Sequence, residues 1–372
     1  MHIGLVVNSS WNALNFRKSL IAHFIRDGHS VTIVAPDDGY SQELINLGCC
    51  FQPLRISNKG TNPLEDIWLL RQLFSIYKKF RFDVVLHYTI KPNIYGSLAA
   101  KLINVPCINN VTGLGTVFIH NNLSSRVAHW LYKLAFKFPK VVFFQNPDDK
   151  ELFESRKLVS ASITDLVPGS GIDTELFKLS SNALGCQSSC FTFLMVARLL
   201  FDKGIVEYVD AIRLLRKRGI KAKFQVLGKV ELQKGLGVTP DMVLEWQNEG
   251  LIEYLGAVSD VRPIVEAAHC VVLPSYREGT PRSLLEAASL SKPLVATNVP
   301  GCTETVLDGY NGFLCEVRNA EDLADKMWKM YTLTPEKLKE MGHNSRKLVE
   351  EKFDMRIVIT KYENAIYDKI LL

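Results

Sequence analysis

Two glutamates, Glu278 and Glu286, are separated by seven residues in the stretch S-Y-R-E-G-T-P-R-S-L-L-E. Gly279 permits a tight turn, Thr280 is a candidate N-cap, and Pro281 suits the first position of a helix. The pattern therefore predicts Glu278 just before a helix and Glu286 inside it. Unpaired amides at such a helix start favour an anion or a polar sugar as ligand. A capped helix with two solvated acids is the alternative interpretation.

Two cations lie earlier in the chain, in the stretch F-L-M-V-A-R-L-L-F-D-K-G. Arg198 ends an apolar run, and Lys203 follows just before Gly204 and a helical pattern. An arginine can bind a diphosphate through two parallel hydrogen bonds, and a lysine adds a point charge. The stretch predicts a diphosphate site, and a pair of surface cations is the alternative.

The acids and the cations follow the apolar runs that should form parallel strands. Residues 271–274 and 293–297 are short apolar runs on either side of the helix that contains Glu286, as in a β-α-β unit. Because such folds bind ligands at the carboxyl ends of their strands, all four charged residues should line one crevice. Two cations and two acids suit a nucleotide diphosphate sugar, with the cations on the pyrophosphate and the acids on hydroxyl groups.

Apolar runs alternate with helical patterns along both halves of the chain. A segment rich in Pro and Gly, residues 166–177, interrupts the alternation and predicts a linker. We therefore expect an α/β protein with two doubly wound, Rossmann-like domains that face each other across a cleft. The predicted domains are residues 1–168 and 169–355, with a last helix at 356–372 that packs back on the first domain.

Composition narrows the class of protein. The chain has 372 residues, 47% of them hydrophobic and 22% charged, as in folded soluble proteins. No apolar run reaches the roughly 18 residues that span a bilayer. The first residues predict a strand and not a signal peptide, and eight cysteines without a CxxC pair argue for reduced thiols and against zinc. We therefore expect a cytoplasmic protein.

The basic charge is concentrated in the first half. Residues 1–168 carry 18 Lys and Arg against 12 Asp and Glu, whereas residues 169–372 carry 26 against 27. This asymmetry predicts an anionic partner for the first half. Nucleic acid is disfavoured because the net charge is only +5 and no nucleic-acid motif occurs. A dehydrogenase is disfavoured because no G-x-G-x-x-G follows the first strand.

Together these stretches resemble a known family. Over essentially its whole length the chain resembles the retaining glycosyltransferases of family four, which have the GT-B fold. The resemblance rests on the Glu278-x7-Glu286 pair and on Arg198 with Lys203-Gly204. It also rests on P-G-S-G-I-D-T-E-L-F, which resembles the interdomain segment of the family, and on P-G-C-T-E-T-V-L-D-G-Y-N-G-F-L. Each motif is weak alone, but the combination is specific.

The resemblance implies a donor site in the second half. Arg198 and Lys203 would bind the donor diphosphate and stabilise the charge of the leaving group, and Glu278 would contact the donor sugar. These three are the expected catalytic residues. Glu286 would bind the ribose hydroxyls, and Val258 would lie beside the base. The remaining members of the expected donor site are Gly279, Thr280, Pro281, Arg282 and Ser283. The resemblance implies neither a bound metal nor a cofactor.

The first half resembles the branch of the family that builds surface polysaccharides on polyprenyl diphosphate carriers. The stretches H-Y-T-I-K-P-N-I-Y-G and N-N-V-T-G-L-G-T-V-F carry this resemblance. The expected acceptor side consists of Asn8, Ser9, His87, Lys91, Asn110, Thr112 and Gly113. Lys91 would face the acceptor diphosphate, and Gly113 would let the backbone approach the cleft. His87 has two interpretations, a structural histidine at a strand end or a catalytic one.

Two positions depart from the family. Many members have a histidine near the donor sugar where this chain has Thr112, so Asn110 or Thr112 itself is the candidate replacement. Asn8, Ser9 and Ser10 replace the usual glycine pair of the first loop. Asn and Ser can still donate hydrogen bonds to a phosphate.

Residues 126–140 predict a basic, amphipathic helix. Its apolar and basic residues alternate at helical spacing; they are Val127, Trp130, Leu131, Leu134 and Phe138, with Arg126, Lys133, Lys137 and Lys140. The apolar side could pack against the core. Alternatively, the helix could lie on a membrane surface, where a lipid-linked acceptor would be delivered.

The resemblance to the family implies a retaining hexosyltransferase. The expected donor is a UDP-sugar, with UDP-N-acetylgalactosamine as the first choice and glucose or galactose as the second. The expected acceptor is a glycan on polyprenyl diphosphate in bacterial surface polysaccharide biosynthesis, such as capsule or O-antigen. The enzyme would be cytoplasmic and peripheral on the inner face of the cytoplasmic membrane. A nucleotide-sugar epimerase of the same two-domain fold is the alternative.

Overall fold

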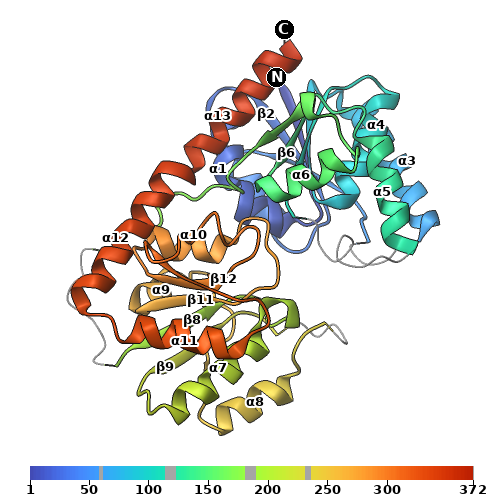
Figure 1. Cartoon of the computed structure of the whole chain (residues 1–372). Coiled ribbons are helices and arrows are strands. Elements are labelled where there is room, and N and C mark those ends of the chain that lie inside the picture. Colours follow the sequence, from blue (N-terminus) through green and yellow to red (C-terminus); the bar gives the residue numbers. More distant parts are fainter. Residues whose placement is uncertain (58–61, 114–122, 181–189, 231–235, 372) are drawn as a thin grey trace. The chain divides into compact units, whose positions relative to one another are not determined.

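The computed structural model describes residues 1–57, 62–113, 123–180, 190–230 and 236–371 (Figure 1). It divides into two compact units. Unit 1 comprises Met1–Gly171 and Met355–Leu372, and unit 2 comprises Ile172–Asp354. The chain passes from unit 1 to unit 2 after Gly171, within the segment rich in Pro and Gly, and returns to unit 1 at Met355. The residues of that segment and of the return passage are hydrogen-bonded, since Ile172 N donates to Phe353 O at 2.9 Å.

Unit 1 is built on a parallel sheet of seven strands in the order β3-β2-β1-β4-β5-β6-β7. The strands are β1 (His2–Val6), β2 (Ser30–Ala35), β3 (Cys50–Pro53), β4 (Val84–Tyr88), β5 (Cys107–Val111), β6 (Val141–Phe144) and β7 (Thr164–Leu166). The order reverses between β1 and β4, which pair in parallel. Doubly wound folds bind ligands beyond the carboxyl ends of the strands at such a switch point.

Helices cover both faces of this sheet. One face carries α1 (Ser10–Arg26), α2 (Ser41–Asn46) and α13 (Met355–Ile366), which is followed by η6 (Tyr367–Leu371). The other face carries α3 (Pro63–Phe80), the π-helix η1 (Pro92–Gly96), α4 (Ser97–Leu102), α5 (Leu123–Ala135) and α6 (Pro147–Ser155). Helices α1 and α13 lie side by side, so residues from both ends of the chain share one core (Figure 1).

Unit 2 repeats the design with six parallel strands in the order β10-β9-β8-β11-β12-β13. The strands are β8 (Thr192–Val196), β9 (Lys223–Leu227), β10 (Glu253–Tyr254), β11 (Cys270–Leu273), β12 (Leu294–Thr297) and β13 (Gly312–Cys315). The helices are η5 (Phe201–Lys203), α7 (Ile205–Lys217), α8 (Pro240–Asn248), α9 (Arg262–Ala267), α10 (Arg282–Ser289), α11 (Ala320–Tyr331) and α12 (Pro335–Lys352). The switch point of this sheet lies between β8 and β11.

The elements that the sequence pattern did not predict are mostly short. They are α2, β3, α6, β7 and β13. Most of them have only three to six residues, too few to show a period of 2 or 3.6. The π-helix η1 continues directly into α4. No helix in the described part of the chain is long and apolar enough to cross a membrane.

Candidate functional site

The loop after β8 carries both predicted cations to the carboxyl edge of the unit 2 sheet. Arg198 is exposed two residues beyond the end of β8, and Lys203 is the last residue of η5. Gly204 follows with φ of +72°, a conformation that favours glycine. A Cβ on Gly204 would overlap the carbonyl oxygen of Pro274. Only glycine therefore lets α7 begin against the end of β11.

Hydrogen bonds hold the loops after β8 and β11 together. The carbonyl oxygen of Asp202 accepts from Tyr276 N at 2.8 Å and from Ser275 Oγ at 3.1 Å. This contact brings Lys203 Nζ to 2.6 Å from Glu278 Oε1, and both side chains are mostly buried. The structure thus pairs a cation and an acid that were predicted from separate stretches of sequence.

The loop after β12 supports the backbone around Glu278. Gly301 has φ of +85°, and a Cβ at this position would overlap the carbonyl oxygen of Gly279. Glu278 N donates to Pro300 O at 3.3 Å, and Gly301 N donates to Glu304 Oε2 at 2.6 Å. The sequence analysis did not assign this supporting role, although the P-G-C-T-E motif contains its signal.

Helix α10 begins one residue later than predicted, at Arg282. Pro281 is therefore the N-cap and not the first helical residue, and Thr280 lies before the cap. The reason is the extended ψ of Pro281, 105°, while its carbonyl oxygen already accepts from Leu284 N and Leu285 N. Glu278 still precedes the helix, and Glu286 lies inside it.

Glu286 pairs with Arg282 across one turn of α10. Arg282 Nε donates to Glu286 Oε1 at 2.8 Å, a pair that the sequence analysis did not predict. Burial raises the pKa of Glu286 above its usual range, and the charge of Arg282 opposes that shift. A largely buried carboxylate held by one arginine is suited to accept hydrogen bonds from hydroxyl groups.

The remaining donor-side residues lie at the same edge of the sheet. Val258 is 42% exposed in the loop after β10. That loop is tied to the loop after β9, because Gly228 N donates to Gly256 O at 2.7 Å. Thr280 and Ser283 are half-buried on either side of the start of α10.

His87 lies in the core, in agreement with its interpretation as a structural histidine. It is fully buried at the end of β4. Its Nε2 accepts from the hydroxyl of Tyr77 at 2.8 Å, and its Nδ1 donates to Asn109 Oδ1 at 2.8 Å. Burial lowers the pKa of His87 to about 4, so the imidazole is neutral at physiological pH.

Two further acceptor-side residues have partners within unit 1. Asn110 is buried, and its Nδ2 donates to the hydroxyl of Tyr362 on α13 at 2.9 Å. Its side chain therefore connects β5 to α13. Lys91 Nζ lies 2.7 Å from Asp66 Oδ1, which anchors the start of η1 to α3.

The other acceptor-side residues follow β1 and β5. Ser9 is the N-cap of α1, since its Oγ accepts from Asn12 N at 3.0 Å. Asn8 is half-buried beside it. Thr112 and Gly113 are half-buried after β5, and the residues that follow them, 114–122, lie outside the described part of the chain.

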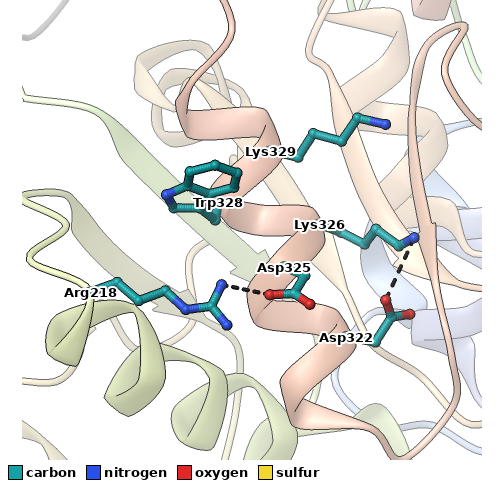
Figure 2. Close-up of a pocket in the computed structure, with 6 residues that line it drawn as sticks. All are labelled: Arg218, Asp322, Asp325, Lys326, Trp328 and Lys329. Atoms are coloured by element: carbon teal, nitrogen blue, oxygen red, sulfur yellow. Dashed lines mark hydrogen bonds and ion pairs between the residues drawn. The ribbon is translucent and has the colours of Figure 1, made fainter.

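Two other groups of side chains lie away from these loops. A pocket on the outer helices of unit 2 is lined by Arg218, Asp322, Asp325, Lys326, Trp328 and Lys329 (Figure 2). Its charges pair with one another, Arg218 with Asp325 at 2.6 Å and Lys326 with Asp322 at 3.5 Å. Because α7 starts at the carboxyl edge and runs back along the sheet, Arg218 lies at the opposite edge from Lys203.

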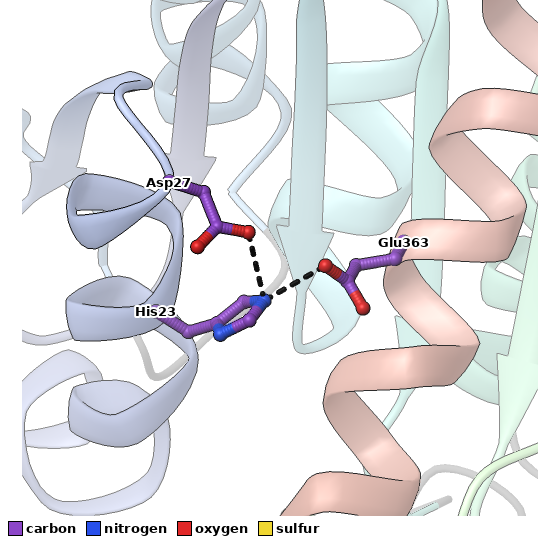
Figure 3. A group of neighbouring side chains, drawn as sticks. All are labelled: His23, Asp27 and Glu363. Carbon is purple, nitrogen blue, oxygen red and sulfur yellow. Dashed lines mark hydrogen bonds and ion pairs between the residues drawn. The ribbon is translucent and has the colours of Figure 1, made fainter.

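In unit 1, His23, Asp27 and Glu363 form a cluster between α1 and α13 (Figure 3). His23 Nε2 lies 2.8 Å from Glu363 Oε1 and 3.3 Å from Asp27 Oδ2. Since His23 and Asp27 lie at the carboxyl end of α1, this cluster is also remote from the carboxyl ends of the strands. It connects two helices and does not belong to the candidate site.

Family models match both halves of the chain. Residues 2–146 match the model for Glycosyl transferase 4-like proteins, and residues 180–348 match the model for Glycosyl transferases group 1. The chain belongs to the glycosyltransferases. The second match contains Arg198, Lys203, Glu278 and Glu286, so it covers the whole candidate donor site.

Two curated relatives of this glycosyltransferase are named for lipid-linked acceptors. One is the N,N'-diacetylbacillosaminyl-diphospho-undecaprenol alpha-1,3-N-acetylgalactosaminyltransferase of Campylobacter jejuni. It is 29% identical over 100% of this chain and 99% of the relative. The other is the UDP-Gal:alpha-D-GlcNAc-diphosphoundecaprenol alpha-1,3-galactosyltransferase of Escherichia coli. It is 26% identical over 83% of this chain and 81% of the relative.

A solved structure with a similar fold is that of HepE from Anabaena in complex with UDP and glucose. The TM-score is 0.80 at 20% identity, over 99% of this chain and 100% of that chain. The likeness confirms the α/β, GT-B fold that the sequence predicts, with its two Rossmann-like units.

Proposed function

We propose that this glycosyltransferase transfers N-acetylgalactosamine from UDP-N-acetylgalactosamine to a glycan on a polyprenyl diphosphate, with retention and without a metal. The observation that carries the proposal is the Lys203–Glu278 pair at the switch point of unit 2. It provides a cation for a diphosphate and an acid for sugar hydroxyls within one crevice. The sugar and the acceptor class follow the name of the Campylobacter relative.

Different residues of unit 2 would bind different parts of the donor. Lys203 and the exposed Arg198 would neutralise the diphosphate, and Glu278 would accept hydrogen bonds from the sugar. Because Glu278 already holds Lys203 at 2.6 Å, the lysine is oriented before the donor binds. Glu286, fixed by Arg282, would bind the ribose hydroxyls, and Val258 would lie beside the base.

The proposed reaction is a substitution at the anomeric carbon. The bond from that carbon to the UDP oxygen breaks, and a bond to the acceptor oxygen forms on the same face. The proton of the acceptor hydroxyl passes to the departing phosphate oxygen. The negative charge that develops on the leaving diphosphate would be stabilised by Lys203 and Arg198, which makes electrostatic stabilisation the main catalytic contribution.

The proposal is tested by a transfer assay on synthetic polyprenyl-diphosphate-linked glycans with a panel of UDP-sugars, in buffer with and without EDTA. We expect turnover with UDP-N-acetylgalactosamine above that with UDP-glucose or UDP-galactose, an α-linked product by NMR, and no effect of EDTA. A β-linked product would refute retention. Conversion of UDP-sugar in the absence of acceptor would favour the epimerase.

We also propose that α5 holds the enzyme on the cytoplasmic face of the membrane. Its core side consists of Tyr132 and Ala135, whereas Val127 is 48% and Trp130 63% exposed. The basic residues of the segment, Arg126, Lys133, Lys137 and Lys140, are exposed as well. An exposed tryptophan among lysines suits the interface of an anionic bilayer.

Co-sedimentation with vesicles of phosphatidylglycerol and phosphatidylethanolamine tests this contact. We expect Trp130→Ser and the triple change of Lys133, Lys137 and Lys140 to Gln each to reduce the bound fraction. Trp328→Ser is the matched control, because Trp328 is a 45% exposed tryptophan on α11 of unit 2. Equal binding of all variants would show that the exposed side of α5 does not contact lipid.

A further inference from the structure

Arg17 is a buried cation without a carboxylate partner among the described residues. It lies on the core-facing side of α1 and is only 5% exposed. Its Nη1 donates to the carbonyl oxygen of Phe16 at 3.1 Å. Its Nε is sealed from solvent and has no hydrogen-bond acceptor. A buried charge of this kind costs free energy unless an anion or a set of hydrogen bonds compensates it.

The guanidinium of Arg17 lies near the switch point of the unit 1 sheet. Helix α1 follows β1, and the guanidinium carbon of Arg17 lies 4.3 Å from the centre of the ring of Tyr88, the last residue of β4. Arg17 therefore lies at the carboxyl edge of the sheet between β1 and β4, the switch point of unit 1. The equivalent position in unit 2, between β8 and β11, holds the Lys203–Glu278 pair.

Two side-chain oxygen atoms in the segment after Tyr88 are also sealed from solvent without a hydrogen bond. Thr89 Oγ1 and Asn93 Oδ1 are buried and have no hydrogen bond. They are neighbours, because Asn93 N donates to Thr89 O at 3.0 Å. Thr89 also has φ of +72°, which is rare for a β-branched residue and strains the backbone. Strain and unpaired polar atoms occur together at this switch point.

These residues belong to one connected neighbourhood in unit 1. Asn93 Nδ2 donates to Asn110 O at 2.9 Å, and Asn110 Nδ2 donates to the hydroxyl of Tyr362 at 2.9 Å. The positive charge of Arg17 reaches Tyr362, where it opposes the rise that burial imposes on the pKa of that phenol. The cluster thus joins α1, β4, β5, η1 and α13 around one cation.

We propose that Arg17 binds a phosphate group of the acceptor diphosphate at the β1/β4 switch point of unit 1. The inference rests on the proposed function, because that function supplies an acceptor with a diphosphate. An arginine can hold a phosphate through two hydrogen bonds, and the anion would compensate the buried charge. Thr89 Oγ1 would donate to the same anion, and Asn93 Oδ1 would accept from a sugar hydroxyl.

Binding of inorganic pyrophosphate tests the site independently of catalysis. The full chain is first saturated with UDP, so that the cations of unit 2 are occupied, and pyrophosphate is then titrated by calorimetry. We expect Arg17→Gln to weaken pyrophosphate binding at least tenfold, Arg17→Lys to weaken it less, and Thr89→Val to weaken it a few-fold. Arg26→Gln, an exposed arginine on the same helix, is the matched control and should bind as the wild type does.

The kinetic test separates a binding role from a structural one. We expect Arg17→Gln to raise the KM for the polyprenyl-diphosphate-linked acceptor at least tenfold and to leave the KM for the UDP-sugar unchanged, without a fall in Tm. A purely structural arginine, whose role is the cation–π contact with Tyr88, would lower Tm and leave pyrophosphate binding intact. That result, or a wild type that does not bind pyrophosphate, would overturn the inference.

The two proposals fail in different ways. If no lipid-linked acceptor is glycosylated but Arg17→Gln still abolishes pyrophosphate binding, the anion site stands and the proposed acceptor is wrong. If transfer occurs and Arg17→Gln leaves both pyrophosphate binding and the acceptor KM unchanged, the reaction stands and Arg17 is not its phosphate-binding residue.

Discussion

At the scale of single residues, the donor site depends on a charge pair and not on isolated charges. Glu278 accepts from Lys203 at 2.6 Å and lies against the loop after β12. A change at Glu278 therefore alters both the contact with the sugar and the orientation of the lysine. Arg198 lies on the same loop after β8 as Lys203, but its side chain is exposed.

We predict that Glu278→Gln lowers kcat at least 100-fold and changes UDP affinity much less. The amide keeps the shape but loses the negative charge that orients Lys203, and losses of this size accompany the removal of one electrostatic contact in other enzymes. Single-turnover kinetics and calorimetry with UDP measure the two effects. Glu253→Gln on the edge strand β10 is the control, and wild-type turnover in Glu278→Gln would contradict the assigned role.

His87 gives a prediction on the pH dependence of stability. Its pKa is lowered to about 4 in the fold, against about 6.5 in an unfolded chain, so the unfolded state binds more protons between these values. Stability should therefore fall as the pH drops from 6.5 to 4, by at most roughly 1.4 kcal/mol per pH unit. We expect the free energy of unfolding of His87→Gln, measured with urea at several pH values, to have a smaller slope against pH in this window than that of the wild type. An unchanged slope would contradict the assignment of His87 to the core.

At the scale of elements, the site is assembled by close contacts between loop backbones. The loop after β8 touches the end of β11 at Gly204, and the loop after β12 touches Gly279 at Gly301. These contacts fix where α7 and α10 begin. The glycines therefore matter to donor binding although they carry no chemistry of their own.

We predict that Gly204→Ala weakens UDP binding at least tenfold, because α7 must move away from Pro274 and take Lys203 with it. Gly219→Ala is the matched control. Gly219 follows the other end of α7 with φ of +78°, and a Cβ there would meet no atom within 4 Å. Both glycines have a positive φ, but only Gly204 contacts Pro274. Equal UDP affinity of the two variants would therefore show that the contact with Pro274 does not determine UDP binding.

The sequence predicted the long elements well, for definable reasons. Residues 223–227 form a strand in which apolar Phe224 and Val226 alternate with polar Lys223 and Gln225, a pattern that is visible in the sequence. The face of the sheet to which a side chain points was harder to predict. Since β4 is buried on both faces, its sequence does not show that His87 points toward Tyr77. Arg17 was missed because it looks like an ordinary helix charge until α13 packs beside it.

At the scale of the whole molecule, unit 1 is discontinuous in sequence. Helix α13 contributes Val358, Ile359, Tyr362, Ala365 and Ile366 to the core that it shares with α1. Burial of each large apolar side chain contributes about 1.5–3 kcal/mol, so together they account for a large part of the stability of one unit. His23 and Glu363 add a polar contact between the same two helices, near the carboxyl end of α1.

We predict that a chain ending at Asp354 keeps UDP binding and loses transfer. Unit 2 contains no part of α13. Unit 1, in contrast, loses the apolar side chains that α13 contributes to its core and the hydroxyl of Tyr362 that accepts from Asn110. Calorimetry with UDP and hydrogen exchange of unit 1 peptides measure the two outcomes. Retention of acceptor transfer in the shortened chain would show that α13 is dispensable for unit 1.

The return of the chain to its first unit also bears on the order of folding during synthesis. All of unit 2 leaves the ribosome before Tyr362 does, at about 5–20 residues per second. Unit 2 can therefore reach its native state while unit 1 still lacks α13. A nascent chain would be able to bind UDP before it can bind an acceptor, so the half of the enzyme encoded first would be the last to mature.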